Sequence, residues 1–416
     1  MSDEQTIIIV GGGHAGGELA LAVRQNGHQG KILLVGEEPG LPYQRPPLSK
    51  GYLAGDLAAA AIQLKPQANF DKAQVEVMSG CRVAAIRRDS KHIELADGRR
   101  IGYARLALAT GARPRKLPLV GVEAPERLQN FHYLRTFADS EQIRAGFAPG
   151  ARLVIVGGGY IGLEVAATAI KRGLKVTVLE ALPRVLARVT SPEVAEFYAG
   201  VHRAAGVDLR TGANITGWRL NAEGSAVSAV QLADGTEIAT DLVVAGIGVL
   251  PNTELAAAAG LEVDNGIVVD PFARTSDPDI VAAGDCTNHP SALYGRRIRL
   301  ESVPNALEQA RTAAASLCGK EKPYAAVPWF WSDQYDLKLQ MVGLNQGYEH
   351  CVLRGDPAAR SFSAFYLKDG IVIAADTVAR MPEFLLAKRL VAERIPVDAA
   401  ALADDAIPLK TLLPAA

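Results

Sequence analysis

The sequence has few cysteines, and none of them form a closely spaced pair. Only Cys81, Cys286, Cys318 and Cys351 occur among its 416 residues, and no two of them are separated by two or by four residues. Structural zinc sites, iron–sulfur clusters and dithiol redox centres usually need such pairs. We therefore expect reduced, packed thiols, with no bound metal and no dithiol chemistry within the chain.

Charge imbalance and long apolar runs are also absent. Lys and Arg total 44 against 45 Asp and Glu, so no overall field would draw the protein to nucleic acid or to an anionic membrane. No apolar run approaches the roughly 18 residues of a membrane span. The acidic start MSDEQT lacks the basic region and apolar core of a signal peptide. We expect a cytoplasmic protein with no nucleic-acid or membrane partner.

Glycine, in contrast, is abundant. The chain has 40 glycines and is 49% hydrophobic and 21% charged, which is typical of an α/β enzyme with many tight turns. Its length exceeds that of one ordinary hydrophobic core, so two or three domains are expected.

Two segments 146 positions apart follow one plan. IIIVGGGHAGGELA (7–20) and LVIVGGGYIGLEVA (153–166) each place an apolar strand before a glycine-rich turn and a helix. Each copy continues into a further apolar strand, at 31–35 or at 175–179. This pattern predicts two βαβ units.

The repeat extends beyond these units. IGYARLALATGARPR (101–115) and TDLVVAGIGVLPN (240–252) each provide a later strand, and each follows a hairpin-like segment, ADGR or ADGT. From about residue 326 the composition changes to an aromatic block followed by alternating strands. We expect two related domains and a third, C-terminal domain.

Each glycine turn carries the spacing G-x-G-x-x-G. The positions are Gly11, Gly13 and Gly16 in the first copy and Gly157, Gly159 and Gly162 in the second. In a strand–turn–helix context these glycines allow the tight turn, the approach of a pyrophosphate to the backbone, and close helix–strand packing. Glu37 and Glu180 follow at the ends of the next strands, where an acid is expected to bind a ribose diol. The alternative is that the turns only pack.

Two such sites in one chain indicate electron relay. A nicotinamide gives two electrons at once as a hydride, whereas a flavin can accept the hydride and release electrons singly. We therefore expect FAD in one site and NADH in the other. The carboxylate of Glu180 would repel a 2′-phosphate and so favours NAD over NADP, although the nearby Arg184 and Arg188 leave NADP open.

The sequence resembles the FAD-containing pyridine nucleotide reductases, in particular the NADH-dependent ferredoxin reductases. The segments that carry the resemblance are LPYQRPPLSK (41–50), VGGGYIGLEVAATAIK (156–171), AAGLEVDNGIVVD (258–270), TSDPDIVAAGDC (275–286), ESVPNALEQA (301–310) and PWFWSDQYD (328–336). The resemblance implies an α/β fold with two Rossmann-like dinucleotide-binding domains and a C-terminal α/β domain. The expected boundaries are 1–115 and 247–325 for the FAD domain, 116–246 for the inserted NAD domain, and 326–416 for the C-terminal domain.

The resemblance also implies the residues of each cofactor site. Those expected at FAD are Gly11, Gly13, Ala15, Gly16, Glu37, Lys50, Val83, Thr110, Gly111, Arg135, Asp285 and Val303. Those expected at NADH are Gly157, Gly159, Tyr160, Ile161, Gly162, Glu180 and Gly248. Asp285 would accept a hydrogen bond from a ribityl hydroxyl. The alternative for Asp285 is that it caps a following helix.

The residues implied to be catalytic are Lys50, Glu164 and Trp331. Lys50 would stabilise negative charge on the flavin, and Glu164 would pair with Lys50. The alternative for Glu164 is an acid in the first helical turn, which the helix dipole favours without any function. Trp331 would shield the flavin edge. Alternatively, it packs in a core with its aromatic neighbours.

The region 43–50 has no thiol facing the expected flavin, so electrons are expected to leave for an external acceptor. The resemblance implies an acidic 2Fe-2S ferredoxin that feeds a haem-thiolate monooxygenase. A basic patch would steer such a partner, and the candidates for it are Arg311, Lys388, Arg389 and Lys410, each of which could also be ordinary solvated charge. Alternatives are a rubredoxin reductase, the ferredoxin reductase of a ring-hydroxylating dioxygenase, an NADH oxidase, or an NADH-sensing flavoprotein. A monomer or weak dimer is expected.

Overall fold

The structure, a computed structural model, describes residues 5–414, so most of the acidic start lies outside the described residues. The chain divides into two compact units. Of the described residues, the first unit contains 5–44, 59–113 and 249–328, and the second contains 45–58, 114–248 and 329–414. The short segment 45–58, which includes Lys50, therefore belongs to the second unit.

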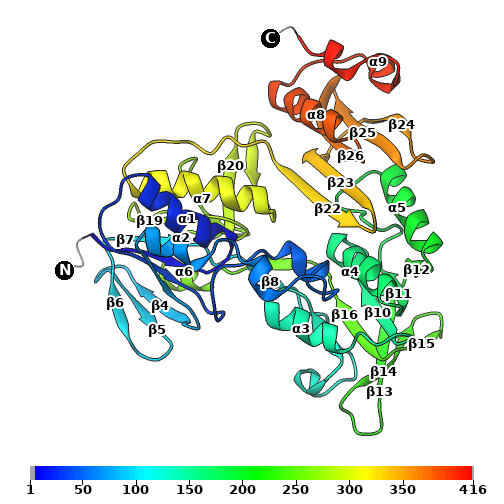
Figure 1. Cartoon of the computed structure of the whole chain (residues 1–416), viewed down its shortest axis with the longest axis horizontal. Helices are drawn as coiled ribbons and strands as arrows, with labels where there is room; N and C mark the ends of the chain where they lie inside the picture. Colours follow the sequence, from blue (N-terminus) through cyan, green and yellow to red (C-terminus); the bar gives the residue numbers. More distant parts are fainter. Residues whose placement is uncertain (1–4, 415–416) are drawn as a thin grey trace. The chain divides into compact units, whose positions relative to one another are not determined.

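The first unit is built on a five-stranded parallel sheet with the order β19-β7-β1-β2-β3. Figure 1 labels two of these strands, β7 and β19. Its strands are β1 (Ile7–Val10), β2 (Ile32–Val35), β3 (Val75–Met78), β7 (Arg105–Leu108) and β19 (Ile280–Ala282). Strand β1 is buried along its whole length, as expected for a parallel sheet that is covered on both faces. The apolar run of this strand is therefore explained by its central position.

Alternate residues of β1 enter two different cores. Ile7 and Ile9 pack with helices α1 (His14–Gln25) and α7 (Val303–Leu317), which lie side by side. Ile8 and Val10 pack on the other face, against a small antiparallel sheet. This sheet consists of β4 (Val83–Arg87), β5 (His92–Leu95) and β6 (Arg100–Gly102). The period of two along the strand thus separates the two layers.

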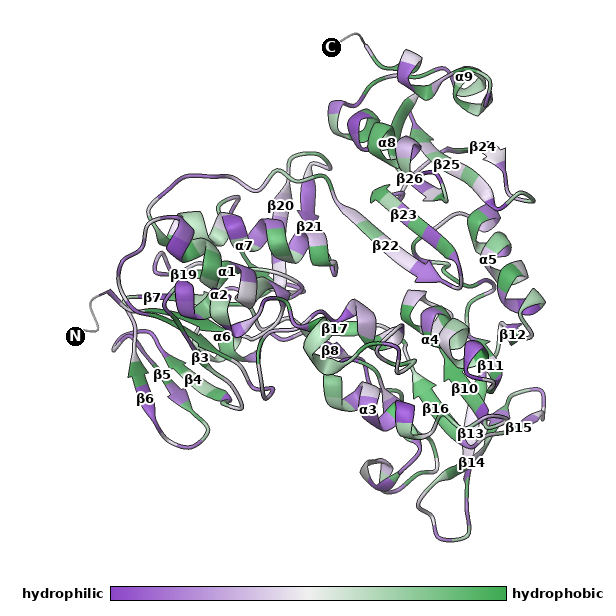
Figure 2. Cartoon of the chain, in the orientation of Figure 1, coloured by the Kyte–Doolittle hydropathy of each residue, from purple (hydrophilic) through white to green (hydrophobic). Residues whose placement is uncertain are grey.

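The second unit repeats this architecture with the strand order β12-β11-β10-β16-β9. Its parallel strands are β9 (Phe131–Tyr133), β10 (Arg152–Val156), β11 (Lys175–Glu180), β12 (Asp208–Thr211) and β16 (Leu242–Ala245). The hydrophobic colour runs along β10 and β16 in Figure 2. Helices α3 (Phe137–Ala145), α4 (Tyr160–Lys171) and α5 (Pro192–Ala204), and the antiparallel strands β13 (Ile215–Leu220), β14 (Val227–Leu232) and β15 (Glu237–Ala239), complete the domain. The predicted duplication is confirmed.

The C-terminal part of the second unit is an antiparallel sheet with the order β22-β23-β26-β25-β24. Its strands are β22 (Trp329–Gln334), β23 (Leu337–Gly343), β24 (His350–Asp356), β25 (Ser361–Lys368) and β26 (Ile371–Val378). Helix α8 (Met381–Glu393) packs on β23 and β26, and a tail follows with α9 (Ala399–Ala403) and the short helix η5 (Leu409–Leu412). The α/β fold class is confirmed. Within residues 5–414 no helix is both long enough and apolar enough to cross a bilayer.

Candidate functional site

The first glycine turn joins β1 to α1. Gly11 has φ +120°, and a Cβ placed there would lie 2.1 Å from the carbonyl oxygen of Ala109. A Cβ at Gly16 would lie 1.8 Å from the carbonyl oxygen of Gly11. These two glycines are therefore required for packing, because no side chain fits at either position. Ala15 lies beside Gly16 in the first turn of α1.

Gly13 has a different environment. It precedes α1 in an extended conformation, no side chain caps the helix there, and no heavy atom lies within 4 Å of where its Cβ would be. The first N–H groups of a helix have no acceptor within the helix and attract anions. The turn is therefore closed on its packing side and open on the side where a phosphate would approach.

The second glycine turn, between β10 and α4, repeats this geometry. Gly157 has φ +110°, and its Cβ would lie 2.3 Å from the carbonyl oxygen of Gly246. A Cβ at Gly162 would lie 2.2 Å from the carbonyl oxygen of Gly157, whereas nothing lies within 4 Å at Gly159. Tyr160 and Ile161 begin α4, and Ile161 is an exposed apolar side chain. Both turns thus leave space at the same position of the motif.

Several other residues expected at FAD follow the carboxyl ends of parallel strands in the first unit. Glu37 comes after β2, Thr110 and Gly111 after β7, and Asp285 after β19. Carboxyl ends of parallel strands meet at one edge of the sheet, which is where open α/β sheets bind ligands. The side chain of Glu37 is 72% exposed there.

The hydrogen bonds around this edge hold its loops in place. The hydroxyl of Thr110 donates to the carbonyl oxygen of Asn252 at 2.6 Å, and Nδ2 of Asn252 donates to the carbonyl oxygen of Thr110 at 2.8 Å.

The alternative that Asp285 caps a helix is wrong, because strand β20 (Thr287–Ser291) follows it. Val303 is the first residue of α7, and Val83 opens β4 and is buried.

Gln309 is one of several buried polar side chains of the first unit with an atom that lacks a hydrogen-bond partner among the described residues. Oε1 of Gln309 accepts hydrogen bonds from the backbone N–H of Gly284 at 2.7 Å and from the hydroxyl of Thr287 at 2.8 Å. Its Nε2 atom is buried and has no hydrogen-bond partner among the described residues. A buried donor of this kind is usually satisfied by water or by a ligand. Together with the open turn at Gly13 and the exposed Glu37, it makes the first unit fit a bound dinucleotide.

Glu180, the acid of the second site, is fixed by the backbone. Its Oε2 accepts from the N–H of Gly158 at 2.7 Å and its Oε1 accepts from the N–H of Leu182 at 2.8 Å. Arg184 donates to three backbone carbonyl oxygens, whereas Arg188 is exposed. The carboxylate is therefore oriented at the end of β11, and Arg184 is already engaged elsewhere.

Gly248, the last residue expected at NADH, follows β16 with φ +105°. Lys50 and Arg135 belong to the second unit, whereas the other residues expected at FAD belong to the first. The carbonyl oxygen of Arg135 accepts from Nη1 of Arg45 at 2.6 Å.

Glu164 and Lys50 form an ion pair. Nζ of Lys50, which directly follows the short helix η2 (Pro46–Ser49), donates to Oε2 of Glu164 at 2.7 Å. The hydroxyl of Ser49 donates to the same oxygen at 2.5 Å. Glu164 is the fifth residue of α4, so it lies beyond the first helical turn, and the dipole alternative is wrong. Its side chain is 5% exposed, and these donors compensate its buried charge.

A chain of hydrogen bonds reaches the other carboxylate oxygen. Ser332 donates to Oε1 of Glu164 at 2.7 Å, and Nε2 of Gln334 donates to Oγ of Ser332 at 3.1 Å. Nε2 of His202 lies 2.9 Å from Oε1 of Gln334, and Nδ1 of His202 lies 3.0 Å from the hydroxyl of Tyr335.

The donors in this chain all point the same way. A carboxamide oxygen only accepts, so Nε2 of His202 donates to Gln334, and Nδ1 of His202 accepts from Tyr335. Burial lowers the pKa of His202, which favours the neutral ring that this arrangement needs. This series of hydrogen bonds therefore ends at the carboxylate of Glu164 and stabilises its negative charge.

Sequence reasoning missed Ser332, Gln334 and His202. The only signal in PWFWSDQYD was a polar run, Ser332 to Gln334, directly after the aromatic block. In the structure the even-numbered residues of β22 contact the dinucleotide domain, as the ring of Phe330 does at 5.0 Å from that of Tyr160. Trp329 and Trp331, whose ring centroids are 5.6 Å apart, occupy the alternate positions.

The four basic residues expected at a docking patch differ in their surroundings. Arg311, in the first unit, pairs with Glu18 and Glu308, each at 2.8 Å. Arg389 pairs with Glu393 at 2.7 Å. Nζ of Lys388 lies 5.1 Å from the ring centroid of Trp329. Lys410 is exposed in η5 and has no ion-pair partner among the described residues.

The described residues contain no cluster of His, Cys, Asp and Glu arranged to hold a metal ion, and all four cysteines are free.

Comparisons with known proteins identify the family of the chain. Residues 5–310 match the pyridine nucleotide-disulphide oxidoreductase family, and residues 329–413 match the reductase C-terminal domain. Putidaredoxin reductase from Pseudomonas putida is 49% identical over all of this chain and 98% of its own length. A crystal structure of the covalent putidaredoxin reductase–putidaredoxin complex has TM-score 0.95, with 98% of each chain covered.

A second solved structure is similarly close. The ferredoxin reductase for the CYP199A2 system from Rhodopseudomonas palustris is 42% identical with TM-score 0.93, over 98% of this chain and 99% of that one. The family match covers both glycine turns and the strand ends that surround them. This chain therefore belongs to the pyridine nucleotide-disulphide oxidoreductase family, within its ferredoxin reductase branch.

Proposed function

We propose that this protein is an NADH-dependent ferredoxin reductase, which binds FAD in the first unit and NADH at the second glycine turn, and reduces a 2Fe-2S ferredoxin. The observation that carries the proposal is the presence of two glycine turns that are open at Gly13 and Gly159, in a chain whose cysteines are all free. Bound FAD supplies hydride acceptance and the release of single electrons. The sequence has no closely spaced cysteine pair that could take these electrons, so the proposal gives them to an external acceptor.

In this proposal Lys50 and Glu164 organise the place where NADH reacts. Glu164 is held by Lys50, Ser49 and Ser332, at distances of 2.7, 2.5 and 2.7 Å. It fixes the Lys50 ammonium group, which would otherwise be mobile on its long stem. A fixed cation can stabilise negative charge that develops during hydride transfer without rearranging at that moment.

Glu180 makes NADH the preferred nucleotide. Its two carboxylate oxygens are oriented by the N–H groups of Gly158 and Leu182, so a 2′-phosphate would meet a fixed negative charge. Arg184, which could have offset that charge, donates to backbone carbonyl oxygens instead.

The acceptor in this proposal is an acidic ferredoxin that docks on cations of the C-terminal domain. Lys388 and Lys410 are better candidates than Arg311 and Arg389, because carboxylates already neutralise the two arginines. Trp331 would shape the route by which electrons leave. The relatives named above as partners of putidaredoxin and of a CYP199A2 system support a ferredoxin that feeds a haem-thiolate monooxygenase. We further propose that the protein is a monomer or weak dimer and that it lies in the cytoplasm, where NADH is available.

Anaerobic stopped-flow spectroscopy tests this function. We expect NADH to bleach the absorbance of bound FAD, and an acidic 2Fe-2S ferredoxin to restore it at catalytic rates. Restoration by rubredoxin or dioxygen in preference to ferredoxin would identify a different reductase or an oxidase. A bleached or perturbed spectrum that no acceptor reverses would favour the NADH-sensing alternative.

A further inference from the structure

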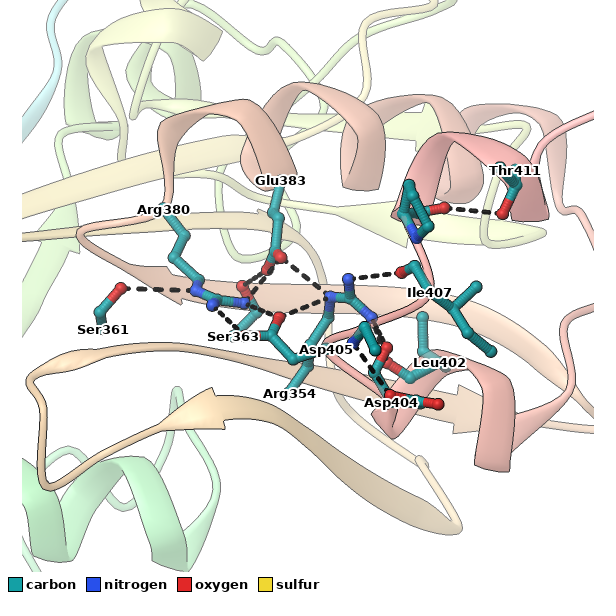
Figure 3. Close-up of polar contacts among 12 residues, drawn as sticks. Arg354, Ser361, Ser363, Arg380, Glu383, Leu402, Asp404, Asp405, Ile407 and Thr411 are labelled. Atoms are coloured by element: carbon teal, nitrogen blue, oxygen red, sulfur yellow. Dashed lines mark hydrogen bonds and ion pairs between the residues drawn. The ribbon is translucent and has the colours of Figure 1, made fainter.

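Arg354 on β24 is a buried cation whose hydrogen bonds go mainly to the C-terminal tail (Figure 3). Its side chain is 3% exposed. Nη1 donates to the carbonyl oxygens of Leu402 at 3.2 Å and Asp404 at 2.6 Å, and Nη2 donates to that of Ile407 at 2.7 Å. One guanidinium group therefore holds three backbone carbonyls of a single short segment.

The surrounding acids neutralise this buried charge. Nε of Arg354 donates to Oε1 of Glu383 at 2.9 Å and lies 3.5 Å from Oδ1 of Asp405. Arg380 makes two hydrogen bonds to Asp405, both 2.7 Å long, and a third to Glu383 at 2.7 Å. Two arginines and two acids thus balance, as a desolvated ion-pair network requires. The network joins the tail to the sheet and to the start of α8.

The clamped segment leads directly into η5. Leu409 is buried and fixes one side of this short helix, and the next residue, Lys410, is exposed. A tail of this length would otherwise be mobile at the end of the chain. Lysine could not replace Arg354, because an ammonium group lacks the planar fork that reaches three carbonyls and a carboxylate together.

We propose that Arg354 is a positioning residue for the acceptor protein, because it presents Lys410 in a fixed place to an acidic partner. This inference rests on the proposed function. A cation on a mobile tail must be ordered when the partner binds, and that ordering costs affinity, whereas a clamped tail has been ordered during folding. Arg354 acts only through Lys410 and does not itself contact the ferredoxin.

The test uses the flavin-loaded, full-length protein and three variants, Lys410→Gln, Arg354→Lys and the double variant. We expect each single variant to lower kcat/KM for an acidic 2Fe-2S ferredoxin by about three- to tenfold at low salt. NADH-dependent reduction of ferricyanide should be unchanged, because this small anion needs no docking surface. The double variant should lose no more than Lys410→Gln alone, since Arg354 acts through that lysine. Lys175→Gln, which removes an exposed cation on β11, is the matched control and should keep wild-type ferredoxin kinetics.

Hydrogen exchange gives a second readout that does not depend on turnover. The backbone amides of residues 402–412 should exchange faster in Arg354→Lys than in the wild-type protein. In Lys410→Gln they should exchange at the wild-type rate. If Arg354→Lys does not fold, Asp405→Asn loosens the same segment at a half-exposed position and should give the same two effects. Additive losses in the double variant, or wild-type tail exchange in Arg354→Lys, would overturn the inference. Failure of the wild-type protein to reduce any ferredoxin would instead overturn the proposed function.

Discussion

The hydroxyl of Ser332 donates a 2.7 Å hydrogen bond to Oε1 of Glu164, and so connects the C-terminal sheet to the ion pair of Lys50. Both residues are buried. Without Ser332, Oε1 of Glu164 would lose its donor and Nε2 of Gln334 would lose its acceptor.

We therefore predict that Ser332→Ala lowers the free energy of unfolding by about 1–3 kcal/mol, which is typical when a buried group loses its partner. We also expect kcat/KM for NADH, with ferricyanide as acceptor, to fall by about tenfold, because the carboxylate of Glu164, and with it the ammonium group of Lys50, would be held less firmly in position. Ser316→Ala is the matched control. It removes a partly buried 2.6 Å hydrogen bond from a buried serine to the carbonyl oxygen of Phe272, in the first unit. Equal kinetic losses in both variants would contradict a positioning role for Ser332.

The middle glycine of each motif allows the two cofactor sites to be tested separately. Space is free around the Cβ positions of Gly13 and Gly159, and both residues have negative φ, so alanine fits the fold at either position. The added methyl group would, however, occupy the path of an approaching pyrophosphate.

We expect Gly13→Ala to lower the flavin-to-protein absorbance ratio after dialysis. Gly159→Ala should keep its flavin and raise KM for NADH by about tenfold or more. Gly200→Ala in α5, where space is also free, controls for the effect of the substitution on folding. Loss of flavin in Gly159→Ala with full retention in Gly13→Ala would reverse the assignment of the two sites.

The glycine turns and their acids could be predicted from sequence because strand, turn, helix and acid are close together in the chain. Gly16 is required because a Cβ there would meet the backbone of Gly11, only five residues earlier. Gly11 is required because a Cβ there would meet the backbone of Ala109, directly after the neighbouring strand β7. The bond between Ser332 and Glu164 joins residues 168 positions apart, and no local pattern predicts which buried serine reaches which carboxylate.

The same limit applies to Arg354. Its neighbourhood, VLRGD, is that of an ordinary surface strand, and only the fold of the distant tail makes this arginine a buried clamp. The resemblance suggested the pairing of Lys50 with Glu164, but it did not predict that residues 45–58 belong to the second unit. Long-range contacts of this kind are set by how the layers pack, which sequence periodicity does not specify.

Nucleotide preference should depend on the charge of Glu180. Glu180→Gln keeps a carboxamide oxygen that can accept one of the two backbone hydrogen bonds, but removes the charge that would repel a 2′-phosphate. We predict that the ratio of kcat/KM for NADPH to that for NADH rises about tenfold, and rises further in Glu180→Arg. Glu223→Gln, at an exposed turn of the same unit, is the matched control. An unchanged ratio in both Glu180 variants would show that another residue selects the nucleotide.

Asp376 on β26 predicts a pH dependence of stability. Its carboxylate accepts hydrogen bonds from Tyr366, at 2.6 Å, and from Thr190, and burial raises its pKa from 3.8 to about 6. Between these pH values the folded state binds more protons than the unfolded state, so this group favours folding at low pH and opposes it above pH 6. A shift of about two units corresponds to roughly 3 kcal/mol. We therefore expect Asp376→Asn to gain stability relative to wild type, by up to this amount, as the pH rises from 4 to 7. Urea unfolding of both proteins at several pH values measures the difference, and a constant difference across that range would show that Asp376 titrates outside it.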